Sequence, residues 1–286
     1  MSRTGDPEAR FITIDGERYS YRRSGEGHAI LLLHGVTDSS RFYWREFFRS
    51  FESEYTVVAM DLRGHGDSEK PRCGYSAADQ AQLVAKFLDG LELDRPILLG
   101  HSLGGIIAAR FALLFPDKVS KLIICDSPLR GGFRKDLKWA TQLPLSGAMI
   151  VGALMIPGLG RFLFSMRSPQ TIRLALELLQ TFSDPSHIPE EIIREKMKAS
   201  YEAVSQSLWQ AVIFENLDKD LHRISVPTLI IRGADDALVP QDQAEKAASR
   251  IPDSQLVIID SAGHFPLLEQ PEQFKRAVSA FLSSTE

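Results

Sequence analysis

The sequence predicts a doubly wound, mostly parallel α/β sheet that is interrupted by a helical segment. Short, continuously apolar runs alternate with helical patterns along the first 126 residues, which is typical of parallel strands covered by helices on both faces. This alternation stops near residue 127 and resumes after residue 218. Because an insertion of about ninety residues is far longer than an ordinary loop, we expect it to be a structural unit of its own.

Each element of the first half follows from its local pattern. Alternating apolar and polar residues around Asp15-Gly16 predict a β-hairpin. Ser76 is placed to cap a helix that we expect to run to about residue 89. The other expected elements are buried strands within residues 29–35, 55–61, 96–102 and 121–127, and helices within residues 42–51 and 103–115.

The second half repeats the strand and helix alternation after the insertion. The insertion itself shows helical patterns at residues 171–182 and 189–204 and no convincing strand. Beyond it we expect a strand within 226–233, a helix within 241–251, a strand within 254–260 and a helix within 271–282. We therefore divide the chain into a first core part, residues 1–126, a helical block, residues 127–218, and a second core part, residues 219–286.

Composition narrows the classes of partner and compartment. The 286 residues carry a net charge of −4 and no long basic cluster, so we expect no nucleic-acid partner. Cys73 and Cys125 are far apart and show no metal-ligand spacing, which favours a reducing, cytoplasmic location. The N-terminus lacks the apolar core of a signal peptide. The most apolar stretch, residues 147–164, is broken by Pro157 and Arg161, so we expect no membrane span.

Ser102 stands out because it joins an apolar strand to an apolar helix in the stretch ILLGHSLGG. Residues 100–104 fit the pattern G-x-S-x-G, in which a sharp strand-to-helix turn exposes a serine hydroxyl. Side chains two positions before and after the serine would collide across such a turn, and glycine has none. The pattern therefore favours a nucleophile over the alternative, a serine helix cap flanked by incidental glycines.

A serine nucleophile needs a base, and the base needs an acid that orients it. His264 follows the last expected strand, which places it at the carboxyl edge of the sheet, where open α/β folds bind their ligands. An acid is available in RGADDALVP, which follows the preceding expected strand at the same edge. The order serine, aspartate, histidine is the one expected for the G-x-S-x-G pattern.

At this point the chain resembles the α/β-hydrolase superfamily over nearly everything outside the helical block. The resemblance is carried by five motifs in order: His34-Gly35, DLRGHGDS at 61–68, GHSLGG at 100–105, G-x-x-D-x-x-V-P at 233–240, and Gly263-His264. It implies an eight-stranded sheet, with the helical block as a cap, or lid, inserted between strands six and seven.

The resemblance also implies roles for individual residues. Ser102 would be the nucleophile, His264 the general base, and Asp236 the acid. Asp235 and Asp126 are the alternative acids, since some relatives place the acid after the earlier strand that ends before Asp126. The oxyanion hole would be formed by the backbone N–H groups of Val36 and Leu103. The resemblance marks two further histidines, His34 and His65, as scaffold residues of the loops.

The predicted activity is hydrolysis of a carboxylic ester through an acyl-enzyme, as in carboxylesterases and monoacylglycerol lipases. We expect no metal and no organic cofactor, and activity that rises with pH as His264 loses its proton. Haloalkane dehalogenases and epoxide hydrolases have aspartate at the nucleophile position, so Ser102 argues against both. Three alternatives remain open: a carbon–carbon hydrolase of meta-cleavage products, an acyltransferase or perhydrolase, and a hydrophobic-ligand receptor that keeps a triad.

The substrate is expected to be a small ester with an apolar acyl group. The cap carries many apolar residues that either pack onto the core or form an acyl pocket able to contact a lipid surface transiently. These are Leu143, Leu145, Met149, Ile150, Val151, Leu154, Met155, Ile156, Leu159, Phe162, Leu163 and Phe164. The sequence does not indicate the oligomeric state.

Overall fold

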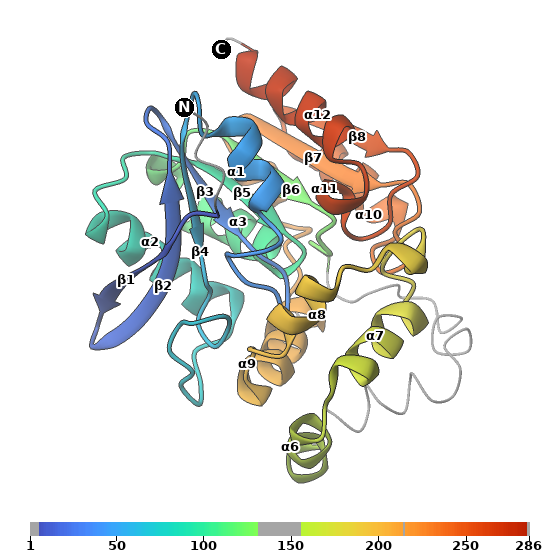
Figure 1. The fold of residues 1–286 in the computed structure, drawn as a ribbon. Coiled ribbons are helices and arrows are strands. Elements are labelled where there is room, and N and C mark those ends of the chain that lie inside the picture. The colour runs from blue at the N-terminus through green and yellow to red at the C-terminus, as the bar shows by residue number, and fades with distance from the viewer. Residues whose placement is uncertain (1–5, 131–155, 214, 285–286) are drawn as a thin grey trace.

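The computed structural model describes residues 6–130, 156–213 and 215–284, and within them eight strands form one sheet. The strand order is β1-β2-β4-β3-β5-β6-β7-β8 (Figure 1). β1 and β2 form an antiparallel hairpin, β2 pairs antiparallel with β4, and every other pairing is parallel. The strands are β1 (Ala9–Ile14), β2 (Glu17–Ser24), β3 (Ala29–Leu33), β4 (Thr56–Met60), β5 (Ile97–His101), β6 (Leu122–Cys125), β7 (Thr228–Gly233) and β8 (Ser254–Ile259).

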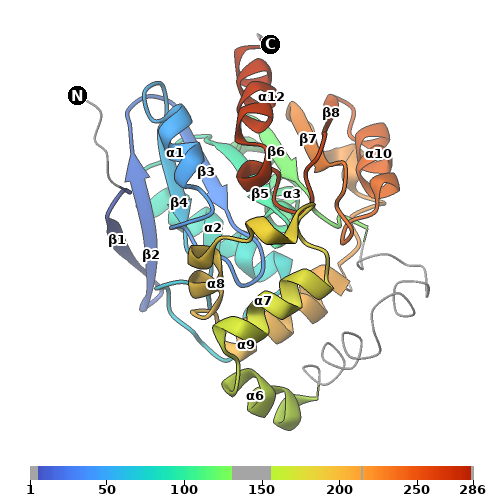
Figure 2. The ribbon, with the colours of Figure 1, turned by 45° about the vertical axis from the view of Figure 1, so that its right-hand side comes forward.

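The sheet is covered on both faces, which confirms the predicted doubly wound class. Neighbouring residues of a buried strand point to opposite faces, so Leu31 and Leu32 belong to two different hydrophobic clusters. α2 (Ala77–Gly90), α3 (Leu103–Leu114) and α10 (Gln241–Arg250) supply the cluster that contains Leu31. The cluster that contains Leu32 is supplied by α1 (Arg45–Phe51), α11 (Pro266–Glu269) and α12 (Pro271–Ser283), which lie on the other face in Figure 2.

Local signals explain several element boundaries. Asp15 and Gly16 have φ values of 51° and 82°, the left-handed conformation that a two-residue hairpin turn requires. Ser76 caps α2 through a capping box with Asp79, as the sequence predicts for the start of this helix. The remaining short helices of the core are η1 (Pro116–Lys118) and η4 (Leu221–Arg223).

The described part of residues 127–218 contains helices and turns but no strand. The helices are α6 (Pro157–Ser165), α7 (Pro169–Leu178), η2 (Pro185–His187), α8 (Glu190–Lys196), α9 (Tyr201–Gln206) and η3 (Ser207–Ile213). The pattern at 189–204 predicts one helix, and the structure forms two. Ser200 explains the break, because its N–H donates to the carbonyl of Gly64 in the core and its side chain accepts from the N–H of Ala203.

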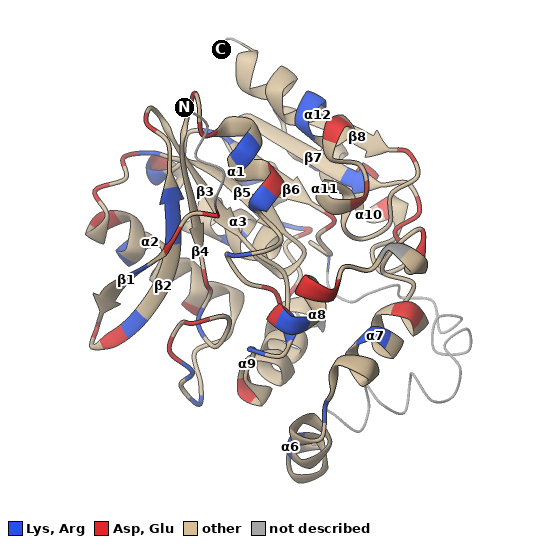
Figure 3. Ribbon diagram, viewed as in Figure 1, with Lys and Arg blue, Asp and Glu red and all other residues tan. Residues whose placement is uncertain are grey.

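The apolar residues expected in the cap divide into two groups. Those from Leu143 to Met155 lie outside the described residues. Of the others, Ile156, Leu159, Phe162 and Leu163 are exposed, and Phe162 and the neighbouring Met166 are 60% and 63% exposed. In the described residues no helix is both long and apolar enough to cross a membrane. Acidic and basic residues are interspersed over the ribbon in Figure 3.

Candidate active site

Strand register gathers the sequence-predicted site residues at one edge of the sheet. Gly100 of β5 pairs with Leu33 of β3, and His101 pairs with Cys125 of β6. β7 pairs with β6, and β8 pairs with β7, in the same parallel sense. The loops after β3, β5, β6, β7 and β8 therefore begin side by side, and these loops carry Val36, Ser102, Asp126, Asp236 and His264 respectively.

Ser102 adopts the strained backbone that the G-x-S-x-G pattern predicts. Its φ of 52° and ψ of −116° lie where residues with a side chain rarely occur. A Cβ added at Gly100 would collide with the backbone of Gly104, and one at Gly104 would collide with the backbone of Leu33. The Ser102 side chain accepts no capping hydrogen bond from α3, which disfavours the helix-cap interpretation and leaves the hydroxyl available for reaction.

His264 and Asp236 form a buried acid–base pair. Nδ1 of His264 lies 2.9 Å from Oδ2 of Asp236, and the two side chains are 5% and 0% exposed. Oδ1 of Asp236 accepts from the N–H groups of Leu238 at 2.8 Å and Val239 at 3.1 Å. Burial would raise the pKa of Asp236, but the charge of His264 and these hydrogen bonds outweigh it and lower the pKa. The ring nitrogen left for a reacting proton is Nε2.

Two backbone contacts hold the His264 loop in place. Its N–H donates to the carbonyl of Thr181 at 2.7 Å, and its own carbonyl lies 2.7 Å from Nε2 of His101. The structure describes both Ser102 and His264 but assigns no hydrogen bond between them. Such bonds often tighten only around bound substrate, so the geometry remains compatible with a nucleophile and its base.

The two alternative acids differ sharply in their surroundings. Asp235 is exposed, which is unsuitable for orienting a buried imidazole. Asp126 is buried, and one oxygen of each carboxyl of Asp126 and Asp236 lies within 4.8 Å of the other and of a His264 ring nitrogen. Among the described residues, these three side chains are also the group whose donor atoms lie close enough to hold a metal ion, and two of them, Asp236 and His264, are hydrogen-bonded to each other.

The predicted oxyanion donors lie at the starts of their loops. Leu103 is the first residue of α3, so its N–H has no acceptor within the helix. No acceptor is assigned to the N–H of Val36 or Leu103 in the part of the chain that the structure describes. Both groups are therefore available to an oxyanion, and the N-terminus of α3 adds a favourable dipole.

A buried ion pair ties α8 to the loop that carries Val36. Nζ of Lys196, the last residue of α8, lies 2.5 Å from Oδ1 of Asp38 and 3.2 Å from Oγ1 of Thr37. The side chains of Lys196 and Asp38 are only 6% and 3% exposed. Thr37 has a φ of 68°, which is strained for a β-branched residue. Lys196 therefore helps to hold the backbone beside Val36.

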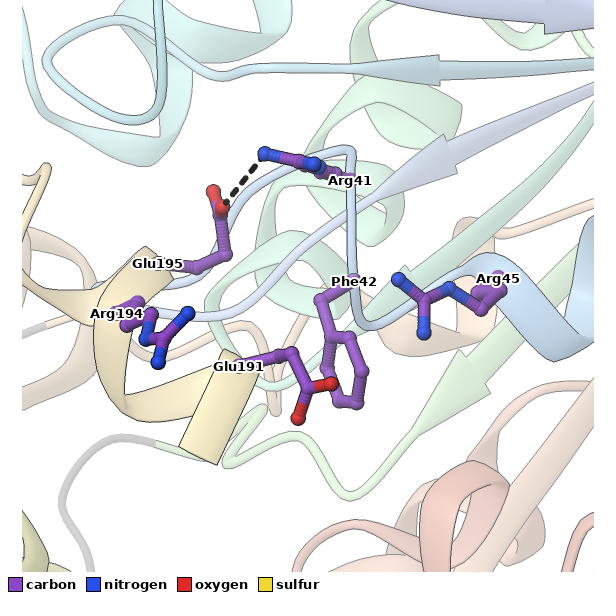
Figure 4. Close-up of a pocket in the computed structure, with 6 residues that line it drawn as sticks. All are labelled: Arg41, Phe42, Arg45, Glu191, Arg194 and Glu195. Atoms are coloured by element: carbon purple, nitrogen blue, oxygen red, sulfur yellow. Dashed lines mark ion pairs between the residues drawn. The ribbon is translucent and has the colours of Figure 1, made fainter. Parts of the chain in front are cut away.

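Further polar contacts follow the junction between α8 and the segment after Asp38. Ser39 donates to Glu195 at 2.7 Å, and Arg41 lies 3.9 Å from the same carboxylate. A small pocket opens at this junction and is shown in Figure 4. Its lining residues are Arg41, Phe42, Arg45, Glu191, Arg194 and Glu195. Sequence reasoning misses these partners because more than 150 residues separate them and neither side carries a motif.

Two buried histidines near the site, His65 and His101, are held neutral. Burial, followed by the charge of His34, lowers the pKa of His65 to about 3. Burial, followed by the charge of His264, lowers the pKa of His101 to about 3. Nδ1 of His65 lies 2.9 Å from the carbonyl of Arg63, and Nε2 is buried without a partner, so a second proton would have no acceptor.

Stability should consequently fall as the pH is lowered. An unfolded histidine binds a proton below about pH 6.5, and the folded His65 binds one only near pH 3, so acid favours the unfolded state. Between about pH 7 and about pH 5, the free energy of unfolding of the wild-type protein should fall by about 2 kcal/mol more than that of His65→Gln. Urea unfolding at both pH values measures this difference. His222→Gln, at an exposed position, is the control, and equal pH dependence in both variants would contradict the assignment.

Comparison with known proteins is consistent with this geometry. A model of the alpha/beta hydrolase fold family matches residues 28–271. "Uncharacterized protein Rv2715" of Mycobacterium tuberculosis is 32% identical over 98% of this chain and 82% of its own. "Epoxide hydrolase 4" of Homo sapiens is 29% identical over 95% of this chain and 77% of its own.

Two further similarities concern the chemistry of the site. A 2-hydroxy-6-oxononadienedioate/2-hydroxy-6-oxononatrienedioate hydrolase of Burkholderia vietnamiensis is 29% identical over 93% of this chain and 91% of its own. Among solved structures, an esterase from Exiguobacterium antarcticum superposes with a TM-score of 0.81 at 26% identity, covering 97% of this chain and 100% of the other. Three of these four proteins are named as hydrolases or esterases, and their names refer to different substrates.

Proposed function

This chain belongs to the alpha/beta hydrolase fold family, and from that premise we propose that it hydrolyses carboxylic esters through an acyl-enzyme formed on Ser102. The observation that carries the proposal is the combination of a strained, uncapped Ser102 with the buried His264–Asp236 pair. Cleavage of an epoxide through an alkyl-enzyme ester would need a carboxylate nucleophile, whereas this position holds a hydroxyl.

In the proposed reaction, Oγ of Ser102 attacks the ester carbonyl while Nε2 of His264 accepts its proton. Asp236 fixes the tautomer of the imidazole and stabilises its charged form. The N–H groups of Val36 and Leu103 bind the developing oxyanion, each worth about 3 kcal/mol. His264 then protonates the departing alcohol, and a water activated by the same imidazole releases the acid.

We propose that residues 127–218 act as a cap that closes the acyl side of the site. Three contacts support this assignment: Lys196 with Asp38, Thr181 with the backbone of His264, and the rings of Phe182 and Phe265, whose centroids are 4.8 Å apart. The exposed apolar side chains of α6 favour an apolar acyl group and a transient contact with a lipid surface. The exposed free thiol of Cys73 favours a cytoplasmic location.

The proposal is tested by hydrolysis of p-nitrophenyl esters from acetate to palmitate. We expect saturable turnover by the wild-type protein, with an optimum at an intermediate or long chain, and none above background by Ser102→Ala. Ser127→Ala, which changes a neighbouring buried serine, is the control for non-specific damage. Equal rates in the wild type and Ser102→Ala would refute the proposal.

A second candidate function is hydrolysis of a carbon–carbon bond. It is favoured by the similarity to the Burkholderia vietnamiensis hydrolase. The same serine, histidine and aspartate would serve that reaction, so the two candidates differ in substrate and not in site. A vinylogous diketo acid turned over much faster than any ester would favour this second candidate.

A further inference from the structure

Asp126 lies beside the catalytic pair but takes no part in the proposed ester mechanism. It follows directly from β6 with a φ of 43°, a strained conformation for a residue with a side chain. Its side chain is turned into the site, because a carboxyl oxygen lies within 4.8 Å of both Asp236 and His264. Counted as whole residues, Asp126 and Asp236 are 2% and 5% exposed, so solvent does not separate their carboxyl groups.

Burial and this close approach make simultaneous ionisation of the two carboxyl groups costly, which favours a state in which one of them holds a proton. The hydrogen-bond donors around them decide which one. Asp236 accepts from two backbone N–H groups and faces the Nδ1 of His264. Asp126 accepts from the N–H of Gly233 at 3.0 Å and from the weak thiol donor of Cys125 at 3.3 Å. The negative charge is therefore better stabilised on Asp236.

We propose that Asp126 is a positioning residue that carries the shared proton and donates a hydrogen bond to Asp236, which stays ionised and directed at His264. This inference rests on the proposed function, in which Asp236 orients the base. The pair then carries one negative charge, which matches the single positive charge of the imidazolium that forms during catalysis. Asp126 touches neither the substrate nor the reacting proton.

The charges around the pair agree with this assignment. Burial, and then the negative charge of Asp236, raise the pKa of Asp126 well above its usual range. Two further titratable groups that interact with Asp126 are Tyr43 and Cys125, and burial raises the pKa of both, so neither adds a negative charge. A ring nitrogen of His264 also lies within 4.8 Å of Asp126, but the hydrogen bond of its Nδ1 goes to Asp236.

Asparagine substitutions at the two positions separate this proposal from its rival, in which Asp126 is the ionised acid. Asparagine at 126 can still accept from Gly233 through its oxygen and donate to Asp236 through its amide, so Asp126→Asn should keep kcat within about threefold. Asp236→Asn should lower kcat by about 10⁴-fold, because it favours the wrong tautomer of the base. Asp126→Leu removes the donor and should lower kcat by about 10- to 100-fold.

Two patterns of activity would overturn the proposal. A severe loss in Asp126→Asn with a mild one in Asp236→Asn would make Asp126 the orienting acid. Wild-type kcat in both Asp126→Asn and Asp126→Leu would leave Asp126 with a packing role only.

An infrared difference spectrum provides a readout that does not depend on ester turnover. At neutral pH, the spectrum of the wild type should contain a protonated carboxyl band that the spectrum of Asp126→Asn lacks. If the variant instead lacks a carboxylate band, the proposal is overturned. If Ser102→Ala shows that esters are not the substrate, this spectrum still decides the protonation of Asp126. The failure of the proposed function and the failure of this inference are thus distinguishable.

Discussion

Replacement of His264 by alanine is expected to lower kcat for ester hydrolysis by about 10⁴- to 10⁶-fold. The serine hydroxyl is a poor nucleophile unless a base removes its proton, and His264 is the imidazole held by a buried carboxylate at this edge of the sheet. Steady-state kinetics on the best p-nitrophenyl ester measure the loss.

His222→Ala is the matched control for this experiment, because it removes an exposed histidine of η4 and should leave kcat unchanged. His101 is the neighbouring imidazole, with its ring centroid 4.9 Å from that of His264. It lies against the His264 carbonyl and is fully buried, so it cannot replace the base. Retention of more than about a tenth of wild-type kcat by His264→Ala would contradict the mechanism.

Lys196→Met is expected to destabilise the fold by about 3–5 kcal/mol, the largest stability effect that we predict. Removing the ammonium leaves the Asp38 carboxylate buried without its counter-ion. Burial alone would raise the pKa of Asp38, and the charge of Lys196 outweighs it and lowers the pKa. Urea unfolding at neutral pH measures the change in the free energy of unfolding.

Lys198→Met is the matched control for the ion pair. Lys198 pairs with Glu195 and Asp67 but is 32% exposed, so its loss should cost about 1 kcal/mol or less. Adding Asp38→Leu to Lys196→Met removes the stranded charge and should recover part of the loss. Similar destabilisation by Lys196→Met and Lys198→Met would show that the buried pair does not hold the cap on the loop that carries Val36.

The sheet and the positions of its motifs could be predicted because local patterns determine them. Apolar runs identify the parallel strands, and turn residues such as Asp15-Gly16 mark the boundaries. Since parallel strands end at one edge, the motifs after them must meet there, which is why Ser102 and His264 could be named from sequence. The choice of Asp236 as the acid came from the resemblance to the α/β-hydrolase superfamily.

The partners of these residues could not be predicted in the same way. Asp126 could be named from the strand before it, but only as an alternative to Asp236, because nothing in the sequence indicates that the two carboxyls share one space. The pairing of Lys196 with Asp38 depends on how the cap is seated on the core, which no local pattern encodes. The split between α8 and α9 likewise depends on a tertiary hydrogen bond from Ser200 to Gly64.

The central claim, that Ser102 becomes acylated, is tested most directly by intact-mass spectrometry after reaction with an alkyl fluorophosphonate. The account predicts that the wild-type protein gains one phosphonyl group, that peptide mapping places it on Ser102, and that Ser102→Ala gains none. His264→Ala should react far more slowly than the wild type. Labelling of Ser102→Ala at the wild-type rate, or no labelling of the folded wild-type protein, would contradict the account.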